Sequence, residues 1–109
     1  MCSVGQPTEA LPFIQLNFKK SLLASVEFAK RVSKTKDFIC FASEPYIAYD
    51  KVGNKPPGTK VFSEGKAPRA AILFRRDIIL TGITKLSNRD CVVAFTVIKG
   101  ALTVVASIY

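Results

Sequence analysis

The chain has 109 residues, of which 49% are hydrophobic, and it carries a formal net charge of +8. This length allows at most one modest domain, and the apolar content argues against a disordered chain. The charge favours an anionic partner such as a nucleic acid, but an acidic remainder of a larger protein would explain it equally well. The basic residues are scattered between Lys19 and Lys99 without a dense cluster, so the charge is weak evidence for such a partner.

The residue types exclude several kinds of site. The chain contains no histidine and no Cys-x-x-Cys pair, which rules out a zinc centre or a histidine-assisted nucleophile built from these residues alone. Cys2, Cys40 and Cys91 are odd in number and far apart, which is typical of a reducing compartment. No apolar run approaches the roughly 20 residues that span a bilayer, and no signal peptide is apparent. We therefore expect an intracellular protein without a membrane partner.

The first part of the chain predicts a strand, a helix and a second strand. Residues 1–12 are interpreted as a loose leader, outside a domain that we place at residues 13–109. Residues 13–18 alternate between apolar and polar side chains, as in a strand with one buried face. Residues 21–34 have helical spacing and begin with a serine that can cap the helix. Its apolar stripe comprises Leu22, Val26, Phe28, Ala29 and Val32. Residues 37–42 predict a strand buried on both faces and parallel to the first.

The rest of the chain predicts a loop and a series of short strands. Residues 43–58 are rich in proline, glycine and lysine and form a loop of functional length. Strands are predicted at residues 59–62, 69–74, 78–81, 91–98 and 102–109. Hairpin turns are expected at residues 75–77 and 99–100. This order predicts an α/β fold with one early helix and a mixed sheet, whose second face needs cover that the chain does not contain.

The chain reaches its last residue, Tyr109, inside the apolar run 101–109. A native domain rarely leaves the edge and faces of a core strand open. We therefore expect the chain to be the N-terminal half of a domain truncated at its C-terminus, with the missing half as its structural partner.

Three polar residues are candidates for a site. Glu44 follows the buried strand, where a carboxylate is costly unless it binds a hard cation or accepts hydrogen bonds. Asn17 lies at the end of the first strand, and the ends of parallel strands meet at one edge of a sheet. Tyr109 ends another strand, where its phenol could donate to an anionic oxygen. Taken singly, Asn17 is more often a strand-end residue that satisfies a loop, Glu44 a solvated loop carboxylate and Tyr109 an ordinary strand aromatic. Asp90, in a turn, is interpreted as solvated or structural.

Five short segments follow one another in a particular order. They are residues 13–17 (FIQLN), 41–46 (FASEPY), 69–72 (RAAI), 87–90 (SNRD) and 107–109 (SIY). This order resembles the endonuclease/exonuclease/phosphatase family, and within it the apurinic-type endonuclease domain of non-LTR retrotransposon polyproteins. The resemblance covers residues 12–109.

The resemblance implies the N-terminal half of a four-layered α/β sandwich that cleaves DNA with Mg²⁺. It implies that Asn17 orients the catalytic groups, Glu44 binds the Mg²⁺ and Tyr109 contacts the scissile phosphate. Arg69 would reach the DNA backbone, although a strand-edge arginine often only extends into water. The family usually has glutamine where this chain has Ser43. Its Asp-x-Asn and Ser-Asp-His elements are also absent from this chain.

Three functions follow from these observations. The leading hypothesis is part of a Mg²⁺-dependent endonuclease that nicks target DNA in the nucleus before reverse transcription, inactive as this chain alone and linked to a reverse transcriptase. The second is a non-catalytic basic module that binds nucleic acid. The third is a degenerate relic without independent function.

Overall fold

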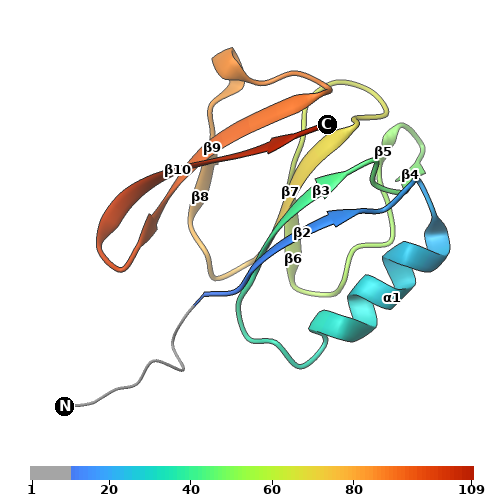
Figure 1. Ribbon diagram of the computed structural model, residues 1–109, viewed down its shortest axis with the longest axis horizontal. Coiled ribbons are helices and arrows are strands. Elements are labelled where there is room, and N and C mark those ends of the chain that lie inside the picture. Colours follow the sequence, from blue (N-terminus) through green and yellow to red (C-terminus); the bar gives the residue numbers. More distant parts are fainter. Residues whose placement is uncertain (1–10) are drawn as a thin grey trace.

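The computed structural model describes residues 11–109, which fold into two main β-sheets and an α-helix (Figure 1). The larger sheet has the strand order β2-β3-β7-β6. Its strands are β2 (Phe13–Asn17), β3 (Ile39–Ser43), β6 (Thr59–Phe62) and β7 (Ala70–Arg75). β2 and β3 run parallel and the other neighbours are antiparallel, so the predicted mixed sheet is confirmed. The predicted leader lies mostly outside the described residues.

Helix α1 (Leu22–Val32) begins where the sequence predicts. The hydroxyl of Ser21 accepts a hydrogen bond from the amide of Ala24 at 3.2 Å, which satisfies one of the free N–H groups of the first turn. In the last turn, Lys30 and Arg31 place positive charge near the carbonyl end of the helix dipole. The helix is therefore capped at both ends, and its charges favour the dipole at the C-terminal end, since the first turn carries no acidic residue.

The buried face of α1 differs in part from the predicted stripe. Phe28 and Val32 are buried as expected, but Leu22 is 48% exposed and Ser25 lies in the core-facing row instead. Ser25 is tolerated there because its hydroxyl donates to the carbonyl of Asn54 at 3.1 Å, which removes the cost of burying a free hydroxyl. The apolar periodicity alone could not reveal this long-range bond.

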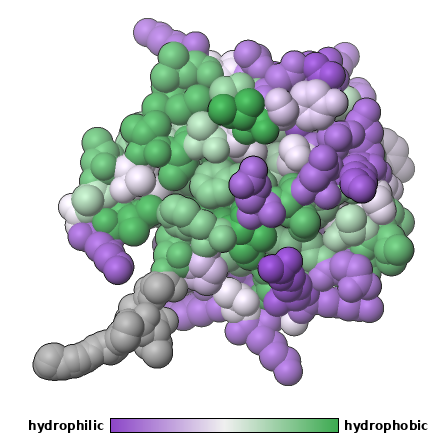
Figure 2. All heavy atoms as spheres, in the orientation of Figure 1, coloured by the Kyte–Doolittle hydropathy of each residue, from purple (hydrophilic) through white to green (hydrophobic). Residues whose placement is uncertain are grey.

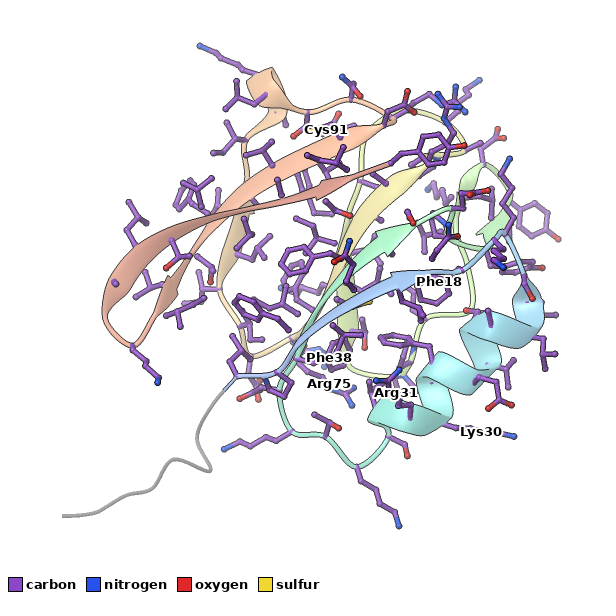
Figure 3. All side chains as sticks on the ribbon, viewed as in Figure 1. Phe18, Lys30, Arg31, Phe38, Arg75 and Cys91 are labelled. Carbon is purple, nitrogen blue, oxygen red and sulfur yellow. The ribbon has the colours of Figure 1, made fainter. Side chains whose placement is uncertain are left out.

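Aromatic rings fill the layer between α1 and the mixed sheet. The ring of Phe28 lies 5.5 Å from those of Phe18 and Phe38, with both pairs edge to face. Phe18 and Phe38 lie between the sheet and the helix in Figure 3. The guanidinium of Arg75 lies 4.8 Å from the Phe38 ring centre and donates to the carbonyl of Val32 at 2.6 Å. Arg75 thus covers one side of the aromatic layer and provides a hydrogen-bond donor for a carbonyl at the C-terminal end of α1.

A second sheet covers the other face of the mixed sheet. It has the order β10-β9-β8 and is antiparallel throughout, with β8 (Leu80–Gly82), β9 (Cys91–Ile98) and β10 (Ala101–Ile108). The buried side chains between the sheets are Ile39, Ala70, Ile72, Phe74, Val92, Ala94 and Val105. The expectation that the chain lacks cover for this face is therefore wrong. The sequence predicts the late strands as part of one mixed sheet, because alternation does not say which sheet a strand joins.

Two turn predictions have different outcomes. Lys99 and Gly100 have φ values of 51° and 80° and connect β9 to β10 as the expected hairpin. The turn at residues 75–77 exists, with the amide of Ile78 bonded to the carbonyl of Arg75 at 3.0 Å, but it carries the chain from one sheet to the other. It is not a hairpin.

The predicted loop at residues 43–58 contains a small hairpin of its own. Strands β4 (Ile47–Ala48) and β5 (Lys51–Val52) pair through Tyr49 and Asp50, both of which have positive φ values. A short 3₁₀ helix, η2 (Thr84–Leu86), precedes β9. The fold class is confirmed, with a helical layer, a mixed sheet and an antiparallel sheet forming three layers of an α/β sandwich.

Candidate functional site

The predicted site residues lie at one edge of the molecule, where β2, β3 and β10 end (Figure 1). Asn17 is the last residue of β2, and its strand partner Ser43 is the last of β3. Glu44 follows directly, and the amide nitrogen of Asn17 donates to its carboxylate at 3.4 Å. The parallel pairing thus joins two residues that are 27 positions apart in the sequence.

The backbone fixes the direction in which Glu44 leaves the sheet. Its φ is 46°, a left-handed conformation that is strained for a residue with a Cβ and is often found at functional positions. Its amide donates to the carbonyl of Arg69 at 2.9 Å, and its carbonyl accepts from the amide of Lys20 at 2.7 Å. Asn17 is held similarly, because its side-chain oxygen accepts from the amide of Lys19 at 2.8 Å. The main chain at Glu44 and the side chain of Asn17 are therefore both held by hydrogen bonds, which keeps the two residues adjacent.

Tyr109 is held by two residues from other segments. Arg69 forms a two-pronged ion pair with Asp90, with both nitrogen–oxygen distances at 2.6 Å. The guanidinium lies 4.5 Å from the centre of the Tyr109 ring, and the amide of Tyr109 donates to the carbonyl of Asp90 at 2.7 Å. The hydrogen bond from Arg69 lowers the pKa of the Asp90 carboxyl, and the same bond raises the pKa of the guanidinium.

The four residues singled out from the sequence therefore share one contact network. Arg69 links its two halves, since its carbonyl binds the amide of Glu44 and its side chain stacks on Tyr109. Asp90 is the member that sequence reasoning missed as a contributor to the site. Its place in the SNRD segment was visible, but the pairing with a residue 21 positions earlier was not.

The oxygen atoms at this site meet part of what a hard cation needs as ligands. Glu44 provides a carboxylate beside an amide side chain, and Mg²⁺ in proteins is often held by one or two carboxylates, with water and phosphate completing its shell. Among residues 11–109 there is no group of three or more cysteine, aspartate, glutamate or histidine side chains that could hold a metal ion. Any metal bound at Glu44 would therefore need further ligands from solvent, substrate or other protein residues.

A small polar hollow adjoins this edge. Its volume is about 130 Å³ and it is lined by Gln15, Phe41, Ser43, Ala106, Ser107 and Ile108. Ser107 is buried, and its hydroxyl donates to the carbonyl of Ala42 at 3.1 Å, which ties β10 to β3 beneath the site. The relative positions of Tyr109 and Glu44 thus depend on direct contact between the two sheets.

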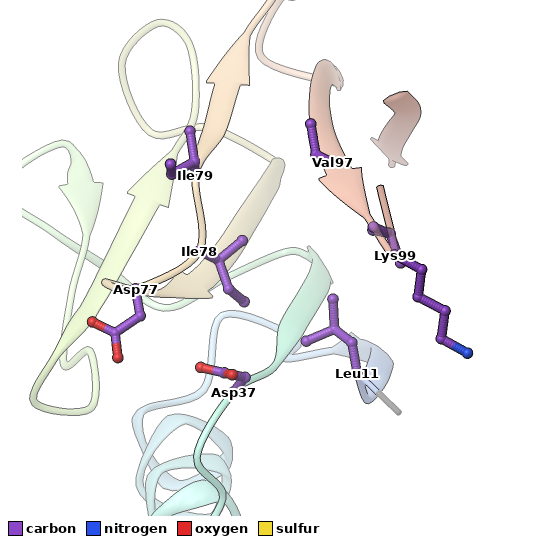
Figure 4. Close-up of a pocket in the computed structure, with 8 residues that line it drawn as sticks. Leu11, Asp37, Asp77, Ile78, Ile79, Val97 and Lys99 are labelled. Atoms are coloured by element: carbon purple, nitrogen blue, oxygen red, sulfur yellow. The ribbon is translucent and has the colours of Figure 1, made fainter. Parts of the chain in front are cut away.

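A larger hollow lies at the opposite end of the sheets and is separate from this site (Figure 4). Its volume is about 390 Å³, and Asp37, Asp77 and Lys99 are its charged lining residues. One carboxylate oxygen of Asp37 is buried without a hydrogen-bond partner among the described residues. The hollow is otherwise mainly apolar and does not contact Asn17 or Glu44.

Comparisons with known proteins are consistent with the resemblance. No protein-family model matches the chain. A 115 kDa protein ascribed to the type-1 retrotransposable element R1DM of Drosophila melanogaster is 24% identical over 76 residues, which cover 70% of this chain and 7% of that protein. The solved endonuclease domain of TRAS1, a telomere-specific non-LTR retrotransposon, superimposes with a TM-score of 0.72 at 24% identity, over 89% of this chain. The chain therefore shares the fold of part of the TRAS1 endonuclease domain.

The chain spans only part of the proteins that it matches. The chain covers 43% of the solved TRAS1 domain and a much smaller share of the curated relative. These matches support the expected resemblance and the fold class. Within residues 11–109, no helix is long and apolar enough to cross a membrane.

Proposed function

We propose that this chain forms part of a Mg²⁺-dependent DNA endonuclease that nicks target DNA for retrotransposition. The observation that carries the proposal is the direct bond from Asn17 to Glu44 at the edge where parallel strands end. Open α/β sheets place their ligands at such an edge. The shared fold with the TRAS1 endonuclease domain supports the same reading.

Each site residue has a distinct role in this proposal. Glu44 holds Mg²⁺, which when bound neutralises charge that develops on phosphate oxygens during cleavage. Asn17 orients the carboxylate by donating to it, and the phenol of Tyr109 donates a hydrogen bond to an oxygen of the scissile phosphate. The side chain of Arg69 is 35% exposed, and in this proposal it contacts the DNA backbone.

The chain requires further residues for the chemical step. It contains no histidine, and among residues 11–109 Glu44 provides the one carboxylate bonded to Asn17. We infer that residues outside this chain activate the attacking water and protonate the leaving group. We infer that the chain alone does not cut DNA, and that it acts in the nucleus within a polyprotein that includes a reverse transcriptase.

A chimera tests this function. Residues 13–109 replace the matching part of the TRAS1 endonuclease domain, and nicking of a supercoiled plasmid is measured with Mg²⁺ and with EDTA. The chimera should nick only with Mg²⁺, and Glu44→Gln should reduce the rate by about 10²-fold or more, the usual cost of losing such charge stabilisation.

Two controls distinguish loss of the site from loss of the folded structure. Asp50→Asn changes an exposed carboxylate in the β4–β5 turn and should leave nicking unchanged. Circular dichroism establishes that each variant is folded. A folded Glu44→Gln chimera that nicks as fast as its parent would show that Glu44 is only a loop carboxylate and that the proposed function is wrong.

A further inference from the structure

We propose that Arg69 is a positioning residue that holds Tyr109 and Glu44 in a fixed relation, an inference that rests on the proposed function of those two residues. Its geometry differs from that of an arginine presented to a phosphate. The main-chain carbonyl of Arg69 bonds to Glu44, and its side chain lies over the ring of Tyr109.

The main-chain contacts place Arg69 between two loops. Its carbonyl accepts the amide of Glu44 at 2.9 Å, and its own amide donates to the carbonyl of Arg89 at 2.8 Å. Residue 89 precedes Asp90, so the turn that supplies the carboxylate is bonded to the same backbone segment. The strained conformation of Glu44 is thus maintained by a bond that depends on where residue 69 lies.

The side-chain contacts orient the phenol. A planar guanidinium that makes two hydrogen bonds to one carboxylate cannot rotate without breaking both. Asp90 therefore fixes the plane of the Arg69 guanidinium that lies over Tyr109. Tyr109 is 54% exposed, and without the stacked cation its ring would have room to change rotamer. Tyr49, which is 98% exposed, represents such an unconstrained ring in the same chain.

The ion pair also determines what Arg69 offers to DNA. Its positive charge is already balanced by a carboxylate at 2.6 Å, so its attraction for a phosphate is weaker than that of an unpaired arginine. Its main contribution to the site is therefore to limit the motion of Tyr109, which lowers the entropy cost of aligning the phenol with a substrate oxygen.

Nuclear magnetic resonance of the chain itself tests this role. With ¹³C-labelled tyrosine rings the three tyrosines give separate signals, and Tyr109→Phe identifies that of Tyr109. Two variants disturb the pair: Arg69→Lys keeps the charge but loses the planar fork, and Asp90→Asn removes the carboxylate charge. Arg75→Lys is the matched control, because Arg75 also lies over an aromatic ring but at the other end of β7.

The expected result is specific to one ring. In Arg69→Lys and in Asp90→Asn, the Tyr109 ring signal should move to the position of Tyr49 and its order parameter should fall, whereas Arg75→Lys should change neither. The amide of Glu44 should stay protected from exchange in Asp90→Asn, because its acceptor is a main-chain carbonyl.

Three outcomes would overturn the proposal. The Tyr109 ring could remain ordered in both variants, Arg75→Lys could loosen it equally, or both variants could unfold, which would make the pair a general structural element. The measurement uses no metal and no DNA, so its result is independent of the nicking assay. If the Tyr109 ring loosens in both variants but the chimera does not nick DNA, the positioning role of Arg69 stands and the nuclease function is wrong.

Discussion

The two faces of the antiparallel sheet differ sharply. Its inner face packs on the mixed sheet through Val92, Ala94 and Val105, and each is less than a tenth exposed. Its outer face is also apolar but lies open, and Figure 2 shows apolar residues gathered over the region of β9 and β10. The exposed members are Phe95, Val97, Leu102, Val104 and Ile108. Apolar side chains thus stabilise the fold on the inner face, whereas on the outer face they form an exposed patch that favours association with other molecules.

Strand pairing makes the outer face continuous. Leu102 lies opposite Val97, and Val104 lies opposite Phe95, so the exposed side chains form cross-strand pairs rather than isolated positions. β10 is also an edge strand of eight residues without a charge or a proline. Such an edge has none of the features that natural sheets use to prevent pairing with another chain.

Core substitution should give the largest effect. Phe38 is fully buried between Phe28 and Arg75, so Phe38→Ala should lower the free energy of unfolding by about 3–5 kcal/mol. Leu102→Ala, on the outer face, should change it by about 0.5 kcal/mol or less, as is usual for exposed positions. Urea unfolding followed by circular dichroism measures both. Equal effects would mean that the outer face is packed against something in solution.

The open face should be visible through self-association. The protein should bind a hydrophobic dye and form larger species in analytical ultracentrifugation, because its exposed apolar pairs form one patch. Val104→Lys should reduce both signals by placing a charge at the centre of that patch. Ser33→Lys adds the same charge at the exposed end of α1 and should have no effect. A clean monomer that does not bind dye would contradict this description of the face.

The buried thiol of Cys40, in the mixed sheet, should make stability depend on pH. Burial raises the pKa of the Cys40 thiol from 9.0 to about 12, so the folded state keeps the proton that the unfolded chain releases. The unfolded state is favoured once its thiol ionises, and stability should therefore fall as pH rises from 9 towards 12. Cys40→Ala should make this slope shallower. An unchanged slope in that variant would assign the effect to other groups.

Local patterns predicted much of the fold. The alternation of residues 13–18, the serine cap and the parallel pairing of β2 with β3 all follow from spacing and turn chemistry. The second sheet was not foreseen, because the turn at residues 75–77 has the composition of a hairpin turn yet leads to another layer. Which layer a strand joins depends on contacts between distant residues, such as Ser107 with Ala42.

The site was predictable to a similar extent. The convergence of Asn17 and Glu44 follows from parallel strands ending together, and the structure places their side chains in contact. The ion pair of Arg69 with Asp90 did not follow, since neither residue lies in a pattern that points to the other. Sequence reasoning therefore located the edge of the sheet but not the contacts that organise it.

Mn²⁺ titration tests the central claim that Glu44 is a metal ligand. Mn²⁺ replaces Mg²⁺ at oxygen sites and broadens nearby amide signals in nuclear magnetic resonance spectra. The account predicts saturable broadening centred on Ser43 and Glu44, absent in Glu44→Gln and retained in Asp50→Asn. Broadening that persists in Glu44→Gln, or that is centred elsewhere, would contradict the assignment of Glu44 as the ligand.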